Sequence, residues 1–375
     1  MLKDFFKKTS VDYFLLLGIF PLLVASLTTL NSFTGQDGLF IHQLIWIAVS
    51  LIIFFALSFV DFRFMRKTGP VIFLYLSAIF FLCILFIFGN KVNGAKSWFS
   101  VGGFSFQPVD LAKLALIFIL AKYFSKRHVE IANIKHIIIS GLYAFLIFGM
   151  VLLQPDFGSA IVIFCIWFGM VLFSGISKKH LLTVILVGAT SFTLLWNFGL
   201  HEYQKQRILN FINPLADIRG SGYNAYQSMV AVGSGGVLGK GIGFGTQSRL
   251  NFLPEYETDF IFAAFSEEWG YIGVLFICSS FALVIFRVLS NASRSESNFE
   301  SLYGVGVAIF LMSHFFINVG MNIGLMPVTG IPLPFVSYGG TNMLICFTSL
   351  GVLMGMRRYS RPANKEAMRN EFLGI

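Results

Sequence analysis

Two short stretches of this chain place ionisable side chains at the start of an apolar run. The sequence PEYETDF puts Glu255 and Asp259 just before a long apolar segment, and QPVDLAK puts Asp110 and Lys113 three positions apart. A carboxylate at the end of an apolar helix is partly removed from water. Its pKa then rises towards the working pH, which makes it a better general base. The first stretch is therefore a candidate for proton-transfer chemistry, and the second is a candidate ligand site.

Each stretch also has a purely structural interpretation. Thr258 and Asp259 begin an apolar helix, where a cap residue and a first-turn carboxylate stabilise the exposed N–H groups by about 1 kcal/mol. Position alone favours this capping role for Asp259. Asp110 and Lys113 share a helix face, so an ion pair and a direct ligand role remain open alternatives for them.

Two further carboxylates follow Asp259 along the same apolar segment. Glu267 and Glu268 are about 12 Å further along a helix that rises 1.5 Å per residue. Carboxylates at such a depth are unfavourable unless they are paired. We expect them to form a structural network with Lys113 or an arginine of the outer face, with a direct mechanistic role as the alternative. His314, like the other histidines, shows no metal-ligand spacing and is interpreted as an ordinary polar contact.

A glycine-rich stretch, GSGGVLGKGIGFGTQ at residues 233–247, suggests a phosphate-binding loop at first sight. A P-loop ending at Lys240 would need glycine in place of Ser234, and a dinucleotide fingerprint starting at Gly241 would need glycine in place of Thr246. Neither pattern is present. The stretch instead indicates a tight backbone fold that approaches a ligand or the membrane closely.

The composition defines the elements that must position these residues. The chain has 375 residues, of which 56% are hydrophobic and 12% charged, against about 25% charged residues in soluble domains. Its mean hydropathy is +0.77 and it contains 45 phenylalanines, which a water-soluble fold of this size cannot bury. The four cysteines lie in apolar runs without metal-ligand or disulfide spacing. The composition therefore excludes a soluble protein and favours a membrane protein.

Apolar runs long enough to cross a bilayer recur along the whole chain. We therefore predict an all-α, polytopic membrane protein of about ten transmembrane helices, forming one domain over residues 1–375 with a basic tail at 357–375. The ten predicted spans lie near residues 13–30, 40–60, 70–88, 109–124, 136–153, 157–174, 181–199, 260–286, 302–324 and 338–356.

The basic residues predict the orientation of these helices. With the N-terminus inside, 19 of the 27 Lys and Arg residues fall in cytoplasmic segments, seven fall outside and Lys113 lies within a span. Both termini are then cytoplasmic, and the net charge of +9 reflects topology rather than nucleic-acid binding. Residues 200–259 become a large extracytoplasmic loop between the seventh and eighth helices.

Several polar motifs fall on the outer side of this topology. They are NGAKSWF (93–99), QPVDLAK (107–113), QPDFGSA (154–160) and MPVTGIPLPFVSYGG (326–340). The Pro and Gly residues of the last motif predict a broken or re-entrant backbone, which is tolerated at membrane depth only where protein or a water-filled cavity covers it. We therefore expect one shared site that faces away from the cytoplasm.

Three long runs carry a family resemblance. They are GSGYNAYQSMVAVGSGGVLGKG, GTQSRLNFLPEYETDFIFAAFSEEWG and NVGMNIGLMPVTGIPLPFVSYGG. They resemble the SEDS family of shape, elongation, division and sporulation proteins, and the run GTQSRLNFLPE is more similar to the rod-elongation (RodA) members than to the division (FtsW) members. The resemblance extends over nearly the whole chain. It implies a peptidoglycan glycosyltransferase of the bacterial inner membrane that polymerises lipid II into β-1,4 glycan strands at the outer face.

The resemblance also implies roles for individual residues. It makes Asp259 the catalytic base of an inverting transfer, with Glu255 beside it. The chain departs from the family at QPVD, where relatives show QPSE, which puts the acidic geometry at Asp110 in doubt. The substrates would be lipid II and a polyprenyl-pyrophosphate-linked glycan. The partners would be a class B penicillin-binding protein and other membrane proteins of the elongation complex, without nucleic acid.

The leaving pyrophosphate gains negative charge, so cations must lie near it. The outer-face candidates, among which the sequence gives no preference, are Lys96, Arg207, Lys240 and Arg249. Lys96 stands where the family often has arginine or glutamine, so it would meet a phosphate only as a point charge. A divalent cation, Mg²⁺ or Mn²⁺, is a further possibility without any metal-ligand spacing to support it.

Aromatic and hydroxyl residues of the same motifs complete the set of candidate substrate-binding residues. Trp98 and Tyr338 belong to the family motifs, although both also fit an aromatic belt at the membrane interface. Ser337 and Lys113 are included because they lie in the motifs of the expected site.

Two other classes of function fit a protein with ten spans. A transporter or flippase of lipid-linked precursors would share the buried charges and broken helices, but such proteins often show paired halves and a midplane site, and no internal repeat is evident here. A non-catalytic scaffold for wall-synthesis partners is the third alternative.

Overall fold

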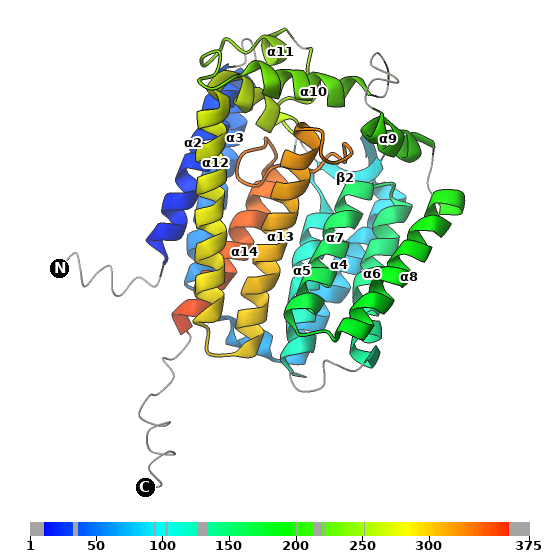
Figure 1. The fold of residues 1–375 in the computed structure, drawn as a ribbon. Helices are drawn as coiled ribbons and strands as arrows, with labels where there is room; N and C mark the ends of the chain where they lie inside the picture. Colours follow the sequence, from blue (N-terminus) through cyan, green and yellow to red (C-terminus); the bar gives the residue numbers. More distant parts are fainter. Residues whose placement is uncertain are drawn as a thin grey trace, which may run out of the picture.

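Ten long helices form the bundle in the part of the chain that the structure describes (Figure 1). The structure is a computed structural model, and it describes residues 11–32, 37–92, 95–101, 104–126, 134–199, 202–213, 220, 222–250 and 252–359. The ten helices correspond to the ten predicted spans. They are α2 (Tyr13–Ser32), α3 (Asp37–Ser58), α4 (Thr68–Phe88), α5 (Pro108–Ser125), α6 (Ile134–Leu153), α7 (Phe157–Phe173), α8 (Lys178–Leu194), α12 (Ile261–Ser293), α13 (Asn298–Asn322) and α14 (Gly340–Tyr359).

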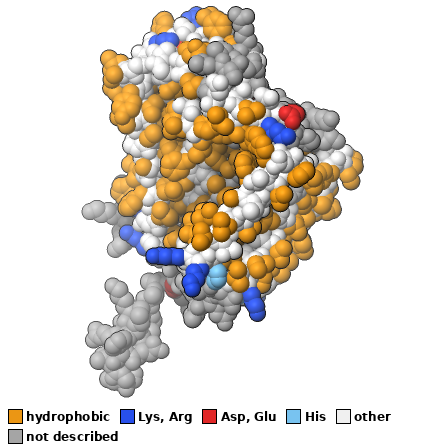
Figure 2. Space-filling view, turned by 45° about the vertical axis from the view of Figure 1, so that its right-hand side comes forward, with side chains coloured by type: hydrophobic (Ala, Val, Ile, Leu, Met, Phe, Trp, Pro, Cys, Tyr) orange, Lys and Arg blue, Asp and Glu red, His pale blue; other side chains and the backbone are white. Residues whose placement is uncertain are grey.

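Helices α5 and α13 form the centre of the bundle. Most residues of α5 are buried, because it packs against α4, α6, α7, α13 and α14. The outer helices α2, α4 and α8 expose large apolar side chains such as Phe20, Phe73 and Leu186. Figure 2 shows that hydrophobic side chains cover much of the visible wall of the bundle. Such a surface requires a lipid solvent, so the chain is a multi-pass helical membrane protein.

The upper end of the bundle carries the short elements (Figure 1). A three-stranded antiparallel sheet precedes α5 and was not predicted from the sequence. Three short helices follow a π-helical turn at Leu195–Gly199, where α8 ends, and a 3₁₀ turn at Phe62–Arg66 precedes α4 at the lower end. The short elements of the upper end are β1 (Asn90–Val92), β2 (Ala95–Val101), β3 (Phe104–Phe106), α9 (Glu202–Ile212), α10 (Tyr223–Ser234) and α11 (Thr246–Arg249).

Helix α12 is broken near its upper end at Gly270, where φ is +64°. The glycine-rich loop after α10 closes the break with backbone hydrogen bonds. The N–H of Tyr271 donates to the carbonyl of Gly236 at 2.9 Å, and the N–H of Gly241 donates to the carbonyl of Glu268 at 3.0 Å. The loop therefore supplies the partners that a break in a helix leaves unsatisfied. The tight backbone fold is present, but its close approach is to α12 and not to a ligand or the membrane.

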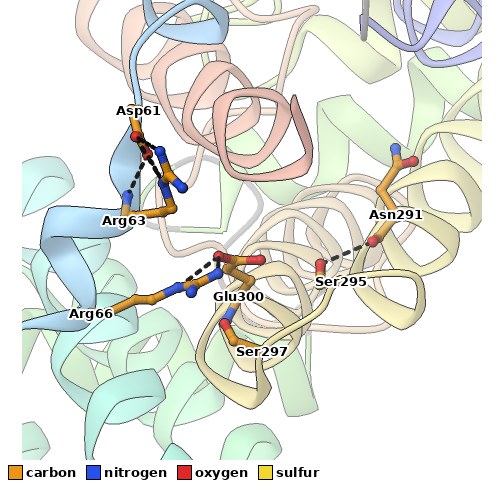
Figure 3. A network of polar contacts seen from close by, with 7 residues as sticks. All are labelled: Asp61, Arg63, Arg66, Asn291, Ser295, Ser297 and Glu300. Atoms are coloured by element: carbon orange, nitrogen blue, oxygen red, sulfur yellow. Dashed lines mark hydrogen bonds and ion pairs between the residues drawn. The ribbon is translucent and has the colours of Figure 1, made fainter. Parts of the chain in front are cut away.

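Ion pairs join the helices at the lower end. Arg66 Nη2 lies 2.6 Å from Glu300 Oε1, and the N–H of Glu300 donates to Ser297 Oγ at the start of α13 (Figure 3). Asp12, just before α2, accepts hydrogen bonds from Arg287 of α12. Asp12 also lies 3.3 Å from Arg357 of α14. The start of α2 and the end of α14 are thus at the same end of the bundle.

Candidate active site

A cavity of about 280 Å³ lies at the upper end of the bundle, among β2, α5, α7, α9, α14 and the irregular segment after α13. It collects side chains from motifs that are far apart in the sequence. Seven of the predicted site residues line it: Trp98, Asp110, Lys113, Arg207, Glu255, Asp259 and Tyr338. The lining does not include Ser337, Lys240 or Arg249. The Lys96 side chain is outside the described residues.

Asp259 presents its carboxylate to this cavity. Helix α12 begins at Ile261, and its N-cap position is Phe260, which makes no side-chain cap hydrogen bond. No described residue donates a hydrogen bond to the Asp259 carboxylate. Gly330 lies so close that a Cβ built on it would be 3.3 Å from Asp259 Oδ2. The capping interpretation of Asp259 is therefore wrong, because the carboxylate faces the cavity instead of the helix end.

The surroundings of Asp259 shift its affinity for a proton. The pKa of Asp259 is raised to about 7, first by burial and then by the negative charge of Glu255, while the positive charge of Arg207 opposes both. A carboxylate with this pKa is ionised in a large fraction of molecules near neutral pH and still accepts a proton readily. This is the balance that a general base requires.

Asparagines of α13 hold the backbone beneath Asp259. Asn318 Nδ2 donates to the carbonyl of Asp259 at 2.9 Å and to the carbonyl of Ile331 at 2.8 Å. Asn322 Nδ2 also donates to the Asp259 carbonyl, at 3.1 Å. Sequence reasoning missed both asparagines. Their spacing of four residues, which places them on one helix face, was the available signal.

The irregular segment after α13 is fixed to the turn that carries the acid. Ser337 Oγ donates to the carbonyl of Thr258 at 2.6 Å and accepts from the N–H of Leu333 at 2.8 Å. The N–H of Tyr338 donates to the carbonyl of Glu257 at 2.8 Å. Ser337 is therefore a positioning residue in this structure, while the Tyr338 side chain lines the cavity. The predicted broken backbone is present between Asn322 and Gly340.

Asp110 and Lys113 form a buried ion pair that also faces the cavity. Lys113 Nζ donates to Asp110 Oδ1 at 2.8 Å, and the two residues are 1–2% exposed. Lys113 Nζ is also 3.4 Å from His314 Nε2. The ion-pair interpretation of Asp110 and Lys113 is confirmed. Both residues also line the cavity, and a direct ligand role for them stays a prediction. His314, which the sequence suggested was an ordinary polar contact, contacts Lys113 directly.

The other predicted cations lie in different surroundings. Lys240 Nζ is 2.7 Å from Glu267 Oε1, which also accepts hydrogen bonds from the N–H groups of Thr246 and Gln247. Glu267 therefore anchors the glycine-rich loop through Lys240. The expected network exists, but its partner is neither Lys113 nor an arginine, because the break in α12 brings the loop to Glu267. Arg249 is exposed at the end of α11.

The start of α7 adds polar groups to the cavity. Asp156 Oδ1 caps α7 by accepting from the N–H of Ser159 at 3.0 Å. Asp156 Oδ2 accepts from Gln107 Nε2 at 3.2 Å. Among the described residues, no group of three or more His, Cys, Asp or Glu side chains is arranged to hold a metal ion.

A second, larger hollow of about 530 Å³ lies between α6, α7 and α8. Its walls are mainly aliphatic and aromatic side chains, among them Ile138, Phe164 and Val187. Phe157, at the start of α7, lines both this groove and the polar cavity. A polar site and an apolar groove therefore meet at one residue.

Comparisons with known sequences show which family the chain belongs to. Residues 7–362 match a family model described as the FtsW, RodA and SpoVE cell cycle proteins. The chain is 34% identical over 364 residues to the peptidoglycan glycosyltransferase MrdB of Escherichia coli, covering 97% of this chain and 98% of that protein. It is also 34% identical over 370 residues to stage V sporulation protein E of Bacillus subtilis, covering 95% and 99%.

Solved structures give the same result. A chain from a peptidoglycan synthase complex, described as coordinating polymerization and crosslinking, superposes with a TM-score of 0.80 and 28% identity over 93% of this chain and 99% of that one. The rod shape determining protein RodA of Thermus thermophilus superposes with a TM-score of 0.70 and 28% identity, covering 93% and 98%. The match of the family model and of full-length relatives shows that the chain belongs to the FtsW, RodA and SpoVE family of cell cycle proteins.

Proposed function

We propose that this chain is a peptidoglycan glycosyltransferase that polymerises lipid II into β-1,4 glycan strands. The observation that carries the proposal is the Asp259 carboxylate, which faces a polar cavity without a hydrogen-bond donor among the described residues and has a pKa of about 7. The full-length relative MrdB is named for this activity. The similarity to MrdB and to RodA favours a role in cell elongation.

The reaction follows from the position of this base. Asp259 accepts the proton of the sugar 4-hydroxyl of one lipid II, and the oxygen forms a bond to the anomeric carbon of the growing glycan. The bond between that carbon and the lipid pyrophosphate breaks with inversion, and the pyrophosphate leaves with the electron pair. The leaving group gains negative charge, so nearby cations stabilise the transition state. Arg207 and Lys113 are the described cations that line the cavity.

The apolar groove supports a lipid-linked substrate. A polyprenyl tail needs an apolar environment while the disaccharide and pyrophosphate need a polar one, and Phe157 marks where the two hollows meet. The apolar groove suits the polyprenyl tail, and the polar cavity suits the disaccharide and pyrophosphate. A transporter would instead need a polar path across the membrane.

Labelled lipid II given to the purified protein tests this proposal. Glycan polymer in detergent is the expected product. Movement of lipid II across liposomes without polymer would identify a flippase instead, and neither activity would identify a scaffold. The assay should be repeated with a class B penicillin-binding protein, which we infer to be the partner because a similar chain occurs in a peptidoglycan synthase complex. Further membrane proteins of an elongation complex are inferred partners as well.

We infer that the cavity faces the outside of the bacterial inner membrane and that both termini are cytoplasmic. The basic residues at the lower end, among them Arg66, Arg287 and Arg357, support this orientation. A reporter that is active only in the cytoplasm should be active when fused after Arg127 and silent after Arg219. Activity at Arg219 would contradict the outer placement of the cavity.

A further inference from the structure

The floor of the polar cavity is formed at the start of α14. Gly339 and Asn342 line the cavity, and α14 runs for 20 residues away from it. The first turn of α14 contains no acidic residue. The N-terminus of a helix carries a partial positive charge and favours an anion. A helix N-terminus forms a specific anion site only when a polar side chain beside it also binds the ligand.

Asn342 is such a side chain. It is 8% exposed, and its Oδ1 accepts from the thiol of Cys346 at a donor–acceptor distance of 3.7 Å. Its Nδ2 is buried and has no hydrogen-bond partner among the described residues. Buried polar groups are nearly always paired, so an unpaired amide donor on a residue that lines the cavity indicates a ligand acceptor.

Lys113 provides a second donor on the same floor. The Cys346 thiol that holds Asn342 is within electrostatic range of both Asp110 and Lys113. One N–H of Lys113 donates to Asp110, and a second points towards His314 Nε2 at 3.4 Å. No described residue accepts the third N–H. Lys113 lines the cavity, so this donor too is available to a ligand.

The contacts of His314 determine its tautomer. His314 Nδ1 is 3.2 Å from the carbonyl oxygen of Pro332, which only accepts hydrogen bonds, so Nδ1 carries the proton. The lone pair of Nε2 then faces the ammonium of Lys113. His314 is buried in α13, so it can fix the direction of Lys113 without contacting a ligand itself.

We propose that Asn342 Nδ2, the third N–H of Lys113 and the start of α14 form a subsite for a phosphoryl oxygen of the lipid-linked pyrophosphate, with His314 as its positioning residue. This inference rests on the proposed function. The lining of the cavity also includes Asp156, Glu255 and Asp259, which repel an anion. Lys113 neutralises Asp110 on the floor. The pyrophosphate therefore binds beside Asn342 and Lys113, and the acidic residues are left to the attacking hydroxyl.

Direct titration of the full-length protein in detergent tests the subsite with two probes. Farnesyl pyrophosphate carries the phosphoryl groups on a short polyprenyl chain, and a phosphate-free N-acetylglucosaminyl-N-acetylmuramic acid disaccharide carries the sugar oxygens. Asn342→Leu removes the donor at similar size and should weaken farnesyl pyrophosphate binding about tenfold or more. Asn342→Asp should weaken it further, while disaccharide binding stays within about twofold.

Thr341→Val is the matched control. Thr341 lies one residue earlier in the same helical turn, and its hydroxyl donates to the carbonyl of Ser105. This variant should bind farnesyl pyrophosphate as the unaltered protein does. Unchanged affinity in Asn342→Leu would overturn the subsite, and so would a loss confined to the disaccharide. Thermal unfolding of each sample identifies any variant that is misfolded, and Asn342→Ser then replaces it as the smaller test.

A pair of variants tests His314 separately. His314→Gln keeps an acceptor for Lys113 and should hold pyrophosphate affinity within about threefold, whereas His314→Leu should lose about tenfold. Equal losses in both would overturn the positioning role. If the unaltered protein fails to polymerise lipid II, the proposed function fails while these titrations still decide the subsite. Absence of farnesyl pyrophosphate binding to the unaltered protein would overturn the subsite alone.

Discussion

The pH dependence of polymerisation should report the ionisation of Asp259. Its pKa of about 7 means that about 10% of the carboxylates are ionised at pH 6 and about 90% at pH 8. If the ionised form is the base, kcat/KM should rise about tenfold between pH 6 and pH 8 and then level off. An ordinary carboxyl with a pKa near 3.8 would give a flat profile over this range.

Two substitutions should move the midpoint of this profile in opposite directions. Glu255→Gln removes a negative charge that raises the pKa of Asp259, so the midpoint should move to lower pH. Arg207→Gln removes a positive charge that lowers the pKa of Asp259, so the midpoint should move to higher pH. Initial rates of polymerisation of labelled lipid II, measured from pH 5 to 9 at subsaturating substrate, give these midpoints.

Stability should change with pH in the opposite sense to activity. The folded protein holds the Asp259 proton more tightly than the unfolded chain, because burial raises the pKa of this carboxyl from 3.8 to about 7. Its contribution to stability is therefore present at low pH and is lost as the pH rises from about 4 to 7. A flat rate profile, or midpoints that move in the same direction in both variants, would refute Asp259 as the base.

Further predictions concern the groups around the site. Gly330→Ala should lower stability by about 1 kcal/mol because Gly330 has φ +74°, and thermal unfolding measures this effect. It should also reduce kcat in the lipid II assay, because the added Cβ would crowd the Asp259 carboxylate. Glu267→Gln should destabilise the protein by about 2 kcal/mol, because Lys240 and the N–H groups of Thr246 and Gln247 lose a charged acceptor; an unchanged unfolding midpoint would contradict this. Asn318→Leu should lower kcat more than it changes KM, because the Asp259 and Ile331 carbonyls lose their shared donor; a pure KM effect would argue against positioning.

The helices could be predicted from the sequence because each is a long apolar run, a signal that is local. The break in α12 could not, since a single Gly270 inside an apolar run does not show that φ is positive there. The partner of Glu267 was missed for the same reason, because Lys240 reaches it only through that break. The short strands around Trp98 were also missed, as seven residues or fewer give too little alternation to distinguish a strand.

The candidate site was predicted in part. Topology placed Asp259, Asp110 and Tyr338 on one face of the membrane, and the structure brings them to one cavity. The roles of Asn318 and His314 depend on contacts with residues far along the chain or across an irregular segment, which no local pattern encodes.

Polymerisation of labelled lipid II by Asp259→Asn tests most directly whether Asp259 is the general base. The carboxamide keeps the size of the side chain but cannot take the hydroxyl proton, so the rate should fall by about 100-fold to 10,000-fold. Glu257→Gln, which alters a half-buried carboxylate two residues away outside the cavity lining, should keep most of its activity. Membrane insertion and co-purification with the class B partner should be measured on the same samples and should match the unaltered protein. A rate for Asp259→Asn close to normal at matched expression would show that the base is another residue.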